Sequence, residues 1–185
     1  MKKEEVLRYL RTSSKTGDEK ILALVERACA DIERTAAPKT LYRIYECRAE
    51  NGVSSIGGVE FKSLRLAENL STCKRAVVFG ATLGYAVDRL INAAAATDVA
   101  LAMAYQAAAA AKIEEVCDEL EEEIKTQYGV SLRRRYSPGY FDLGIEEQKK
   151  LFSLLELTKR TGITLTETLE MVPTKSVTAF IGIED

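Results

Sequence analysis

Apolar residues recur at helical spacing in the first part of the chain, which predicts helices over residues 4–11 and 18–34. Asp18 precedes the second helix and has the short acceptor side chain that favours a helix N-cap. Pro38 ends this helical region because a proline lacks the backbone N–H that a continuing helix needs.

Four stretches favour extended structure. Residues 41–47 alternate and are rich in β-formers, and a second extended stretch runs through paired glycines to about Phe61. Residues 76–82 form a nearly continuous apolar run, which is typical of a strand buried on both faces. Residues 176–183 are expected to form a closing strand.

Further helices are expected between these strands. A short helix begins at Ser63, another covers 85–92, and a long helix runs from Asp98 to about Gln127. Residues 145–160 form one amphipathic pattern that Gly162 stops, and 164–167 are expected to be a short connection.

These elements predict an α+β fold, with a mixed or antiparallel sheet and flanking helices. We divide the chain into an N-terminal helical segment, 1–35, and an α+β domain, 36–185, and expect the two to form one continuous domain, 1–185.

Composition excludes several classes of protein. The formal net charge of −2 disfavours a general nucleic-acid or anionic-membrane binder, and the absence of histidine rules out histidine triads and histidine metal ligands. Cys29, Cys47, Cys73 and Cys117 form no C-x-x-C pair, and no D-x-D-x-D-G loop is present, so we expect no metal site. No signal peptide is evident, and the alanine-rich region 90–111 carries polar residues, so we expect a cytoplasmic protein that does not span a membrane.

The candidate site is the stretch from Arg133 to Tyr140, RRRYSPGY. Pro138 and Gly139 favour a rigid bend, and Ser137 is pushed toward an extended conformation by the proline that follows it. An arginine fork such as that of Arg135 recognises a carboxylate, and the ring of Tyr140 can stack on a purine or face a sulfonium cation. The alternative is a solvated basic turn that links two helices. We expect Arg133 and Arg134 to serve the approach to this turn or to pair with the acidic residues at 114–123.

Several motifs in the C-terminal part resemble the activation domain of vitamin B12-dependent methionine synthase. Arg135-Tyr136-Ser137-Pro138-Gly139-Tyr140 is similar to that family's Arg-x-x-Pro-Gly-Tyr motif. The segment 162–168, followed by Met171-Val172-Pro173 and Ser176-Val177-Thr178, is similar to its Gly-x-x-Leu-Thr-Glu-Ser, Met-x-Pro and Ser-Val-Ser segments. The resemblance covers roughly residues 60–183.

The resemblance implies a domain that binds S-adenosylmethionine and presents it to cobalamin held by another module. Inactive cobalamin would be reduced by one electron from a flavodoxin-type donor and then remethylated. It implies that Arg135 contacts the methionyl part of the ligand, that Ser137, Pro138 and Gly139 shape the pocket, and that Tyr140 lies against the ligand. No catalytic acid or base is expected, because methyl transfer from a sulfonium requires positioning of the reactants.

We therefore interpret the chain as a free-standing reactivation subunit, an accessory to a separate cobalamin-dependent methionine synthase rather than a complete methyltransferase. The family's fused form places an aromatic ligand contact in the final strand, where this chain has Ile181. That difference favours an alternative, a docking or capping partner of another corrinoid methyltransferase that does not bind S-adenosylmethionine. A third hypothesis is an unrelated α+β enzyme that uses tyrosine and glutamate side chains.

Overall fold

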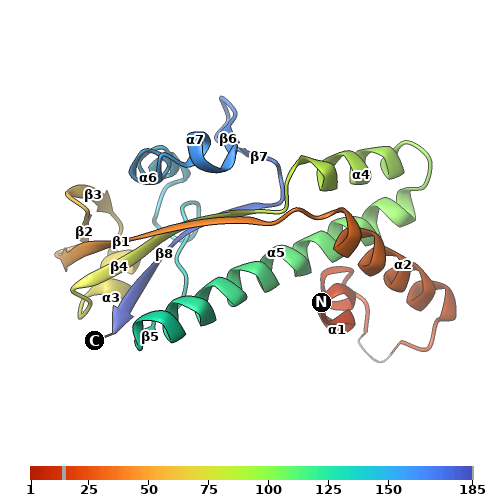
Figure 1. The fold of residues 1–185 in the computed structure, drawn as a ribbon, viewed down its shortest axis with the longest axis horizontal. Helices are drawn as coiled ribbons and strands as arrows, with labels where there is room; N and C mark the ends of the chain where they lie inside the picture. The colour runs from red at the N-terminus through yellow and green to blue at the C-terminus, as the bar shows by residue number, and fades with distance from the viewer. Residues whose placement is uncertain (14–15, 185) are drawn as a thin grey trace.

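A six-stranded antiparallel sheet forms the centre of the computed structural model, which describes residues 1–13 and 16–184 (Figure 1). The strand order is β3-β2-β1-β4-β8-β5, and every pairing between neighbours is antiparallel. The strands are β1 (Lys39–Glu50), β2 (Val53–Ile56), β3 (Val59–Lys62), β4 (Arg75–Thr82), β5 (Ser131–Leu132) and β8 (Ser176–Glu184). The expected α+β fold is confirmed, and the sheet is antiparallel rather than mixed.

Helices cover both faces of this sheet. The long helix α5 crosses one face diagonally, whereas α6, α7 and a two-stranded hairpin lie on the other side (Figure 1). The helices are α1 (Lys3–Tyr9), α2 (Glu19–Thr35), α3 (Leu64–Leu70), α4 (Tyr85–Ala95), α5 (Val99–Tyr128), the 3-10 turn η1 (Ile145–Glu147), α6 (Gln148–Leu155) and α7 (Leu157–Thr161). The hairpin pairs β6 (Thr164–Leu165) with β7 (Met171–Val172).

The continuous apolar run predicted as a doubly buried strand is β4, and its side chains alternate between two cores. Val77 and Phe79 pack on the α5 side, whereas Val78 packs on the opposite side with α3, α6 and α7. Strand β8 divides in the same way, with Phe180 and Ile181 on opposite faces. Because side chains alternate along a strand, a strand buried on both faces needs apolar residues at successive positions.

The alanine-rich half of α5 packs closely against its neighbours. Ala104, Ala108 and Ala109 are fully buried, because side chains this small let adjacent helices approach closely. The same core contains Val6 of α1 and Val25 of α2, so both N-terminal helices share it with the sheet. The division of the chain at residue 35 stays a prediction.

The three predicted helix caps are confirmed. Asp18 accepts a hydrogen bond from the backbone N–H of Lys20 at 2.9 Å, and Ser63 and Asp98 make equivalent caps at the starts of α3 and α5. Each side chain satisfies a backbone donor that the first helical turn leaves unpaired.

The single helix expected over 145–160 is wrong, because the chain breaks at Glu156, which adopts a φ of 51°. Two side chains of β1 donate hydrogen bonds to the carbonyl oxygen of Leu154, Tyr45 at 2.6 Å and Arg43 at 3.2 Å. These bonds end α6, and the chain restarts as α7 with Leu157 packed over Gly80. The prediction of a short connection over 164–167 is also partly wrong, since its first two residues form the strand β6.

Candidate functional site

A cavity of about 760 Å³ opens where the chain leaves the outer edge of β8. Its volume lies in the range of small-molecule sites. Five parts of the chain line it: most of residues 135–141, Glu114 of α5, the beginning of β8, the segment 168–174, and the region from η1 to the start of α6. The lining residues are Glu114, Arg135, Tyr136, Ser137, Pro138, Tyr140, Phe141, Ile145, Gln148, Thr168, Leu169, Glu170, Met171, Val172, Thr174, Ser176, Val177 and Thr178.

The predicted bend forms one wall of this cavity. Tyr136 pairs with Phe180 through two backbone hydrogen bonds of 2.9 Å, and the chain then turns away, with Tyr140 N–H donating to the Ser137 carbonyl at 3.3 Å. Gly139 adopts a φ of +89°, which favours glycine. Ser137, Pro138 and Tyr140 line the cavity, whereas Gly139 forms the turn without being one of the lining residues.

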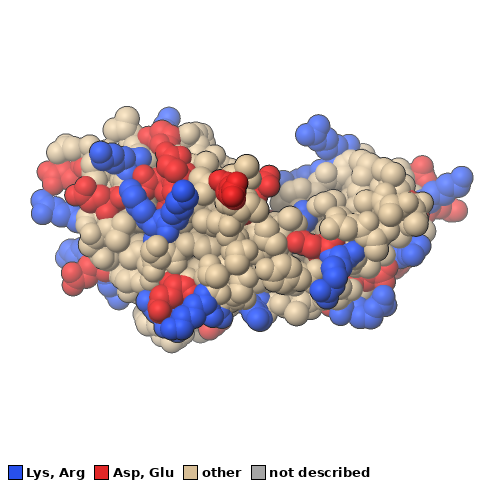
Figure 2. Space-filling model, turned by 90° about the horizontal axis from the view of Figure 1, so that it is seen from above, with Lys and Arg blue, Asp and Glu red and all other residues tan. Residues whose placement is uncertain are grey.

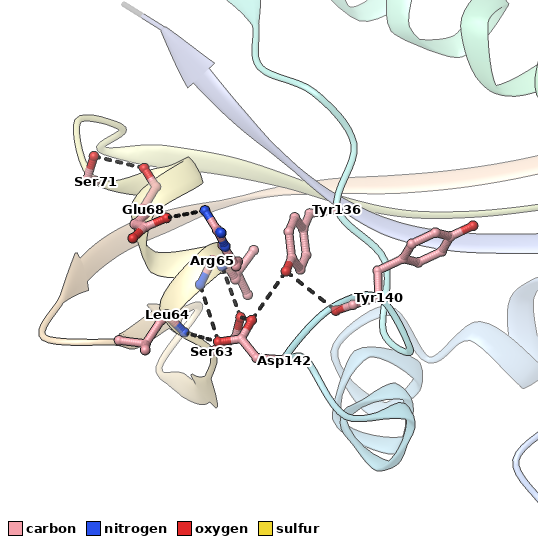
Figure 3. Close-up of polar contacts among 9 residues, drawn as sticks. Ser63, Leu64, Arg65, Glu68, Ser71, Tyr136, Tyr140 and Asp142 are labelled. Carbon is pink, nitrogen blue, oxygen red and sulfur yellow. Dashed lines mark hydrogen bonds and ion pairs between the residues drawn. The ribbon is translucent and has the colours of Figure 1, made fainter.

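Asp142 anchors this bend to the beginning of α3 (Figure 3). Its carboxylate accepts hydrogen bonds of 2.6 Å from the Ser63 hydroxyl and from the Leu64 backbone N–H. The Tyr136 hydroxyl, which Figure 3 shows pointing at the same carboxylate, lies 3.4 Å from it and 3.4 Å from the Tyr140 carbonyl. The Ser63 bond, with help from backbone N–H groups, lowers the pKa of Asp142 from its ordinary value, so the anchor is charged at neutral pH.

Two aromatic rings stand at the mouth beyond this anchor. Tyr140 is 63% exposed and Phe141 is 85% exposed, and Phe141 stacks on Tyr136 with ring centroids 6.2 Å apart. Phe141 has a φ of 51°, a conformation that bulky residues rarely adopt. The anchored turn therefore holds two large apolar rings in solvent beside the cavity.

Arg135 points toward α5, where three carboxylates surround it. Its guanidinium lies 2.9 Å from Glu114, 2.9 Å from Asp118 and 2.9 Å from Glu121, and its side chain is 22% exposed. Burial raises the pKa of Glu121, and the Arg135 charge opposes that effect. Arg135 is thus the member of the triplet that pairs with the acidic helix.

A local bulge explains why Arg135 takes this role. Arg133 N–H donates to the Gly182 carbonyl and Tyr136 pairs with Phe180, so two residues, 134 and 135, lie opposite Ile181 alone. An extra residue of this kind changes the direction of the side chains beside it. Arg133 instead bonds Glu184 at 3.0 Å and Thr72 at 2.8 Å, so of the two roles expected for it, pairing with the acidic helix is not the one observed.

The loop on the far side of the cavity is held from two directions. Thr174 donates its backbone N–H and its hydroxyl to Asp88 of α4, both at 2.8 Å. The buried amide of Gln148 donates to the Leu169 carbonyl at 3.3 Å. These contacts fix the loop that carries Glu170.

The sequence did not single out Asp142, Gln148 or Thr178 as site residues. Asp142 meets α3 across 79 positions of sequence, and no local pattern signals such a contact. Thr178 carried a usable signal, because it is a polar residue inside an apolar strand. Ile181, at the position compared with the family's aromatic ligand contact, is buried on the α5 face and does not line the cavity.

Figure 2 views the molecule from above relative to Figure 1, and on this face charges of both signs are interspersed with uncharged surface. Within residues 1–13 and 16–184, no group of three acidic or cysteine side chains is placed to hold a metal ion. In the same residues, no helix has the length and apolar character needed to cross a membrane.

Comparisons with known proteins agree with the fold and the motifs. The family model of the vitamin B12 dependent methionine synthase activation domain matches residues 77–185, more than half of the chain. A solved structure, described as the MetH reactivation domain bound to AdoHcy, superposes with a TM-score of 0.68 at 18% identity, covering 95% of this chain and 71% of that chain. No curated protein sequence matches. The chain therefore belongs to the family of the activation domain of vitamin B12-dependent methionine synthase.

Proposed function

We propose that the chain binds S-adenosylmethionine in the cavity and presents its methyl group to cobalamin held by a separate methionine synthase or related corrinoid protein. The observation that carries this proposal is the charge of the lining. Its charged side chains, among the described residues, are one guanidinium, Arg135, and two carboxylates, Glu114 and Glu170. S-adenosylmethionine carries one carboxylate and two cations, an ammonium and a sulfonium, so its charges complement the lining.

The carboxylate of the ligand is assigned to Arg135. Arg135 lines the cavity, and three carboxylates of α5 hold its guanidinium in one orientation. A ligand carboxylate would replace one of these partners at a guanidinium that is already positioned, which reduces the entropy lost on binding. An arginine fork is suited to a carboxylate. Glu114 and Glu170 would then face the two cationic groups. The surplus of negative charge favours the sulfonium ligand over S-adenosylhomocysteine, which lacks that cation.

The remaining candidate residues shape the site around the nucleoside. Tyr140 and Phe141 offer exposed ring faces at the mouth, which suit stacking on adenine or contact with the sulfonium. Ser137 and Pro138 contribute the wall, and Gly139 permits the turn that carries them. The solved structure of similar fold is described as bound to AdoHcy, which supports a ligand of this class.

Toward cobalamin, the chain's task would be to hold the sulfonium methyl group at an open mouth. Cobalamin, when bound by its own protein, supplies the cobalt centre that accepts the methyl group. No acid or base is needed from this chain, since displacement at a sulfonium methyl moves no proton. We also propose that the chain acts as an accessory subunit whose partners are a corrinoid protein and a flavodoxin-type electron donor; its membership of the activation-domain family supports this.

Isothermal titration with S-adenosylmethionine and S-adenosylhomocysteine tests the ligand assignment. We expect wild type to bind S-adenosylmethionine more tightly than S-adenosylhomocysteine. Glu114→Gln and Glu170→Gln should each reduce this difference in affinity, because each removes one negative charge. Glu68→Gln, on the exposed side of α3, is the matched control and should leave the difference unchanged. Absence of heat with wild type would exclude the ligand.

A second assay tests the role in trans. A cobalamin-dependent methionine synthase that lacks its own activation module should regain turnover when this chain, the methyl donor and a reductant are added together. Turnover that stays lost, while S-adenosylmethionine binding is intact, would contradict the reactivation role. If the chain retains the corrinoid protein in a pull-down but does not bind S-adenosylmethionine, it is instead a docking or capping partner of a corrinoid methyltransferase.

A further inference from the structure

Thr178 of β8 carries a buried hydroxyl that the fold leaves unpaired. The residue is 2% exposed and lines the cavity, and its Oγ1 has no hydrogen-bond partner among the residues that the structure describes. Buried polar groups in proteins are nearly always paired, and an unpaired one costs about 1–3 kcal/mol. An unpaired hydroxyl at the wall of a cavity therefore points to a partner that the cavity supplies.

Neighbouring polar side chains do not share this feature. The hydroxyl of Ser176, two residues earlier on the same strand, lies 2.8 Å from that of Thr82 and donates to the Pro173 carbonyl at 2.7 Å. Gln148, the third buried polar residue of the cavity lining, donates to the Leu169 carbonyl. The polar residues that support the loop are thus paired within the protein, whereas Thr178 is not.

Thr178 also lies where the edge of the sheet faces the cavity. Phe180 directs its backbone N–H and carbonyl outward to Tyr136, and the chain turns away after that pairing. Alternate residues of a strand direct their backbone groups to the same side, so the backbone of Thr178 faces this edge too. A ligand in the cavity would therefore meet the strand edge at the position where the unpaired hydroxyl is found.

We propose that Thr178 is a ligand-binding residue whose hydroxyl forms a hydrogen bond with a polar group of the molecule in the cavity. This inference rests on the proposed function in taking S-adenosylmethionine as that molecule. It adds to the site a residue that lies outside the Arg-x-x-Pro-Gly-Tyr motif and comes from the closing strand.

Two substitutions separate the hydroxyl from the shape of the side chain. Thr178→Val keeps the shape and removes the hydroxyl, and Thr178→Ser keeps the hydroxyl. Ser54 of β2 is the matched control, because its fully buried hydroxyl also has no partner among the described residues but lies outside the cavity. The measurements are the Kd for S-adenosylmethionine by isothermal titration and the Tm of the ligand-free protein.

We expect Thr178→Val to raise the Kd by about 3- to 12-fold, the loss of one neutral hydrogen bond. The same variant should have an unchanged or higher Tm without ligand, because it removes an unpaired buried hydroxyl. Thr178→Ser should keep the wild-type Kd within about 2-fold, and Ser54→Ala should leave it unchanged. A purely structural role would lower the Tm and the affinity together.

The outcomes that overturn the inference are distinct. If wild type binds S-adenosylmethionine and Thr178→Val binds it equally well, the hydroxyl makes no contact and the proposed function stands without it. If Thr178→Val loses affinity only in proportion to a lower Tm, the residue is structural. If wild type does not bind S-adenosylmethionine, the proposed function fails, and this inference fails with it.

Discussion

Replacing Arg135 by alanine removes the cation that three carboxylates of α5 share. Glu114 and Asp118 are about half exposed or more, so each pair contributes up to about 1 kcal/mol. Glu121 is only 17% exposed and would be left buried without its partner, which adds about 1–2 kcal/mol. We expect Arg135→Ala to lower the free energy of unfolding by about 2–3 kcal/mol, and the Tm by about 4–12 °C.

Urea unfolding at neutral pH measures this loss, with Arg134→Ala as the control. Arg134 is exposed and has no ion pair among those found for the described residues, so its replacement should change the free energy of unfolding by less than about 0.5 kcal/mol. Adding Glu121→Gln to Arg135→Ala should recover part of the loss, since it removes the stranded charge. Equal stability of the two alanine variants would refute the reasoning.

The pH dependence of the same variant gives an independent test. Burial raises the pKa of Glu121 in the folded protein, so the folded state binds a proton more readily than the unfolded state. The contribution of Glu121 to the free energy of unfolding therefore rises as the pH falls from its pKa in the folded state to its lower pKa in the unfolded state. Without Arg135 that pKa should rise further. The deficit of Arg135→Ala should therefore shrink as the pH is lowered from neutral toward the ordinary carboxyl range, and a deficit that grows would contradict the assignment.

Three further substitutions test other parts of the fold and of the site. Gly80→Ala would place a Cβ 2.6 Å from a methyl of Leu157, and urea unfolding should show a loss of about 1–3 kcal/mol; an unchanged midpoint would mean that Leu157 moves aside at no cost. Asp142→Asn should lower the Tm at pH 7, and because the pKa of Asp142 is lowered, the difference from wild type should vanish as the pH falls through that value; a pH-independent difference would contradict this. Asp88→Ala removes both acceptors of Thr174, so titration calorimetry should show weaker S-adenosylmethionine binding, and an unchanged Kd would show that the loop holds its position without them.

Much of this fold follows from local signals in the sequence. The caps at Asp18, Ser63 and Asp98, and the doubly apolar strand at 75–82, depend on residues close together in the chain, and the structure contains them. The break at Glu156 could not be read in this way, because it depends on side chains of β1 that are more than a hundred residues away.

The candidate site shows the same division. The bend at Pro138 and Gly139 is local and was predictable, and acidic residues at 114, 118 and 121 fall on one helical face. Which arginine meets that face depends on the bulge opposite Ile181, and strand register is not visible in the arginine triplet itself. The unpaired hydroxyl of Thr178 likewise appears only when all its neighbours are in place.

The position of β8 has a consequence for synthesis of the chain. It is made after every other strand of the sheet, yet it lies between β4 and β5 and supplies one wall of the cavity. Until residues 176–184 leave the ribosome, the apolar strand β4 presents an open edge, the kind of surface on which chains associate wrongly. A nascent chain should therefore bind the ligand only after β8 has been synthesised. A nascent chain stopped at residue 175 should depend on chaperones.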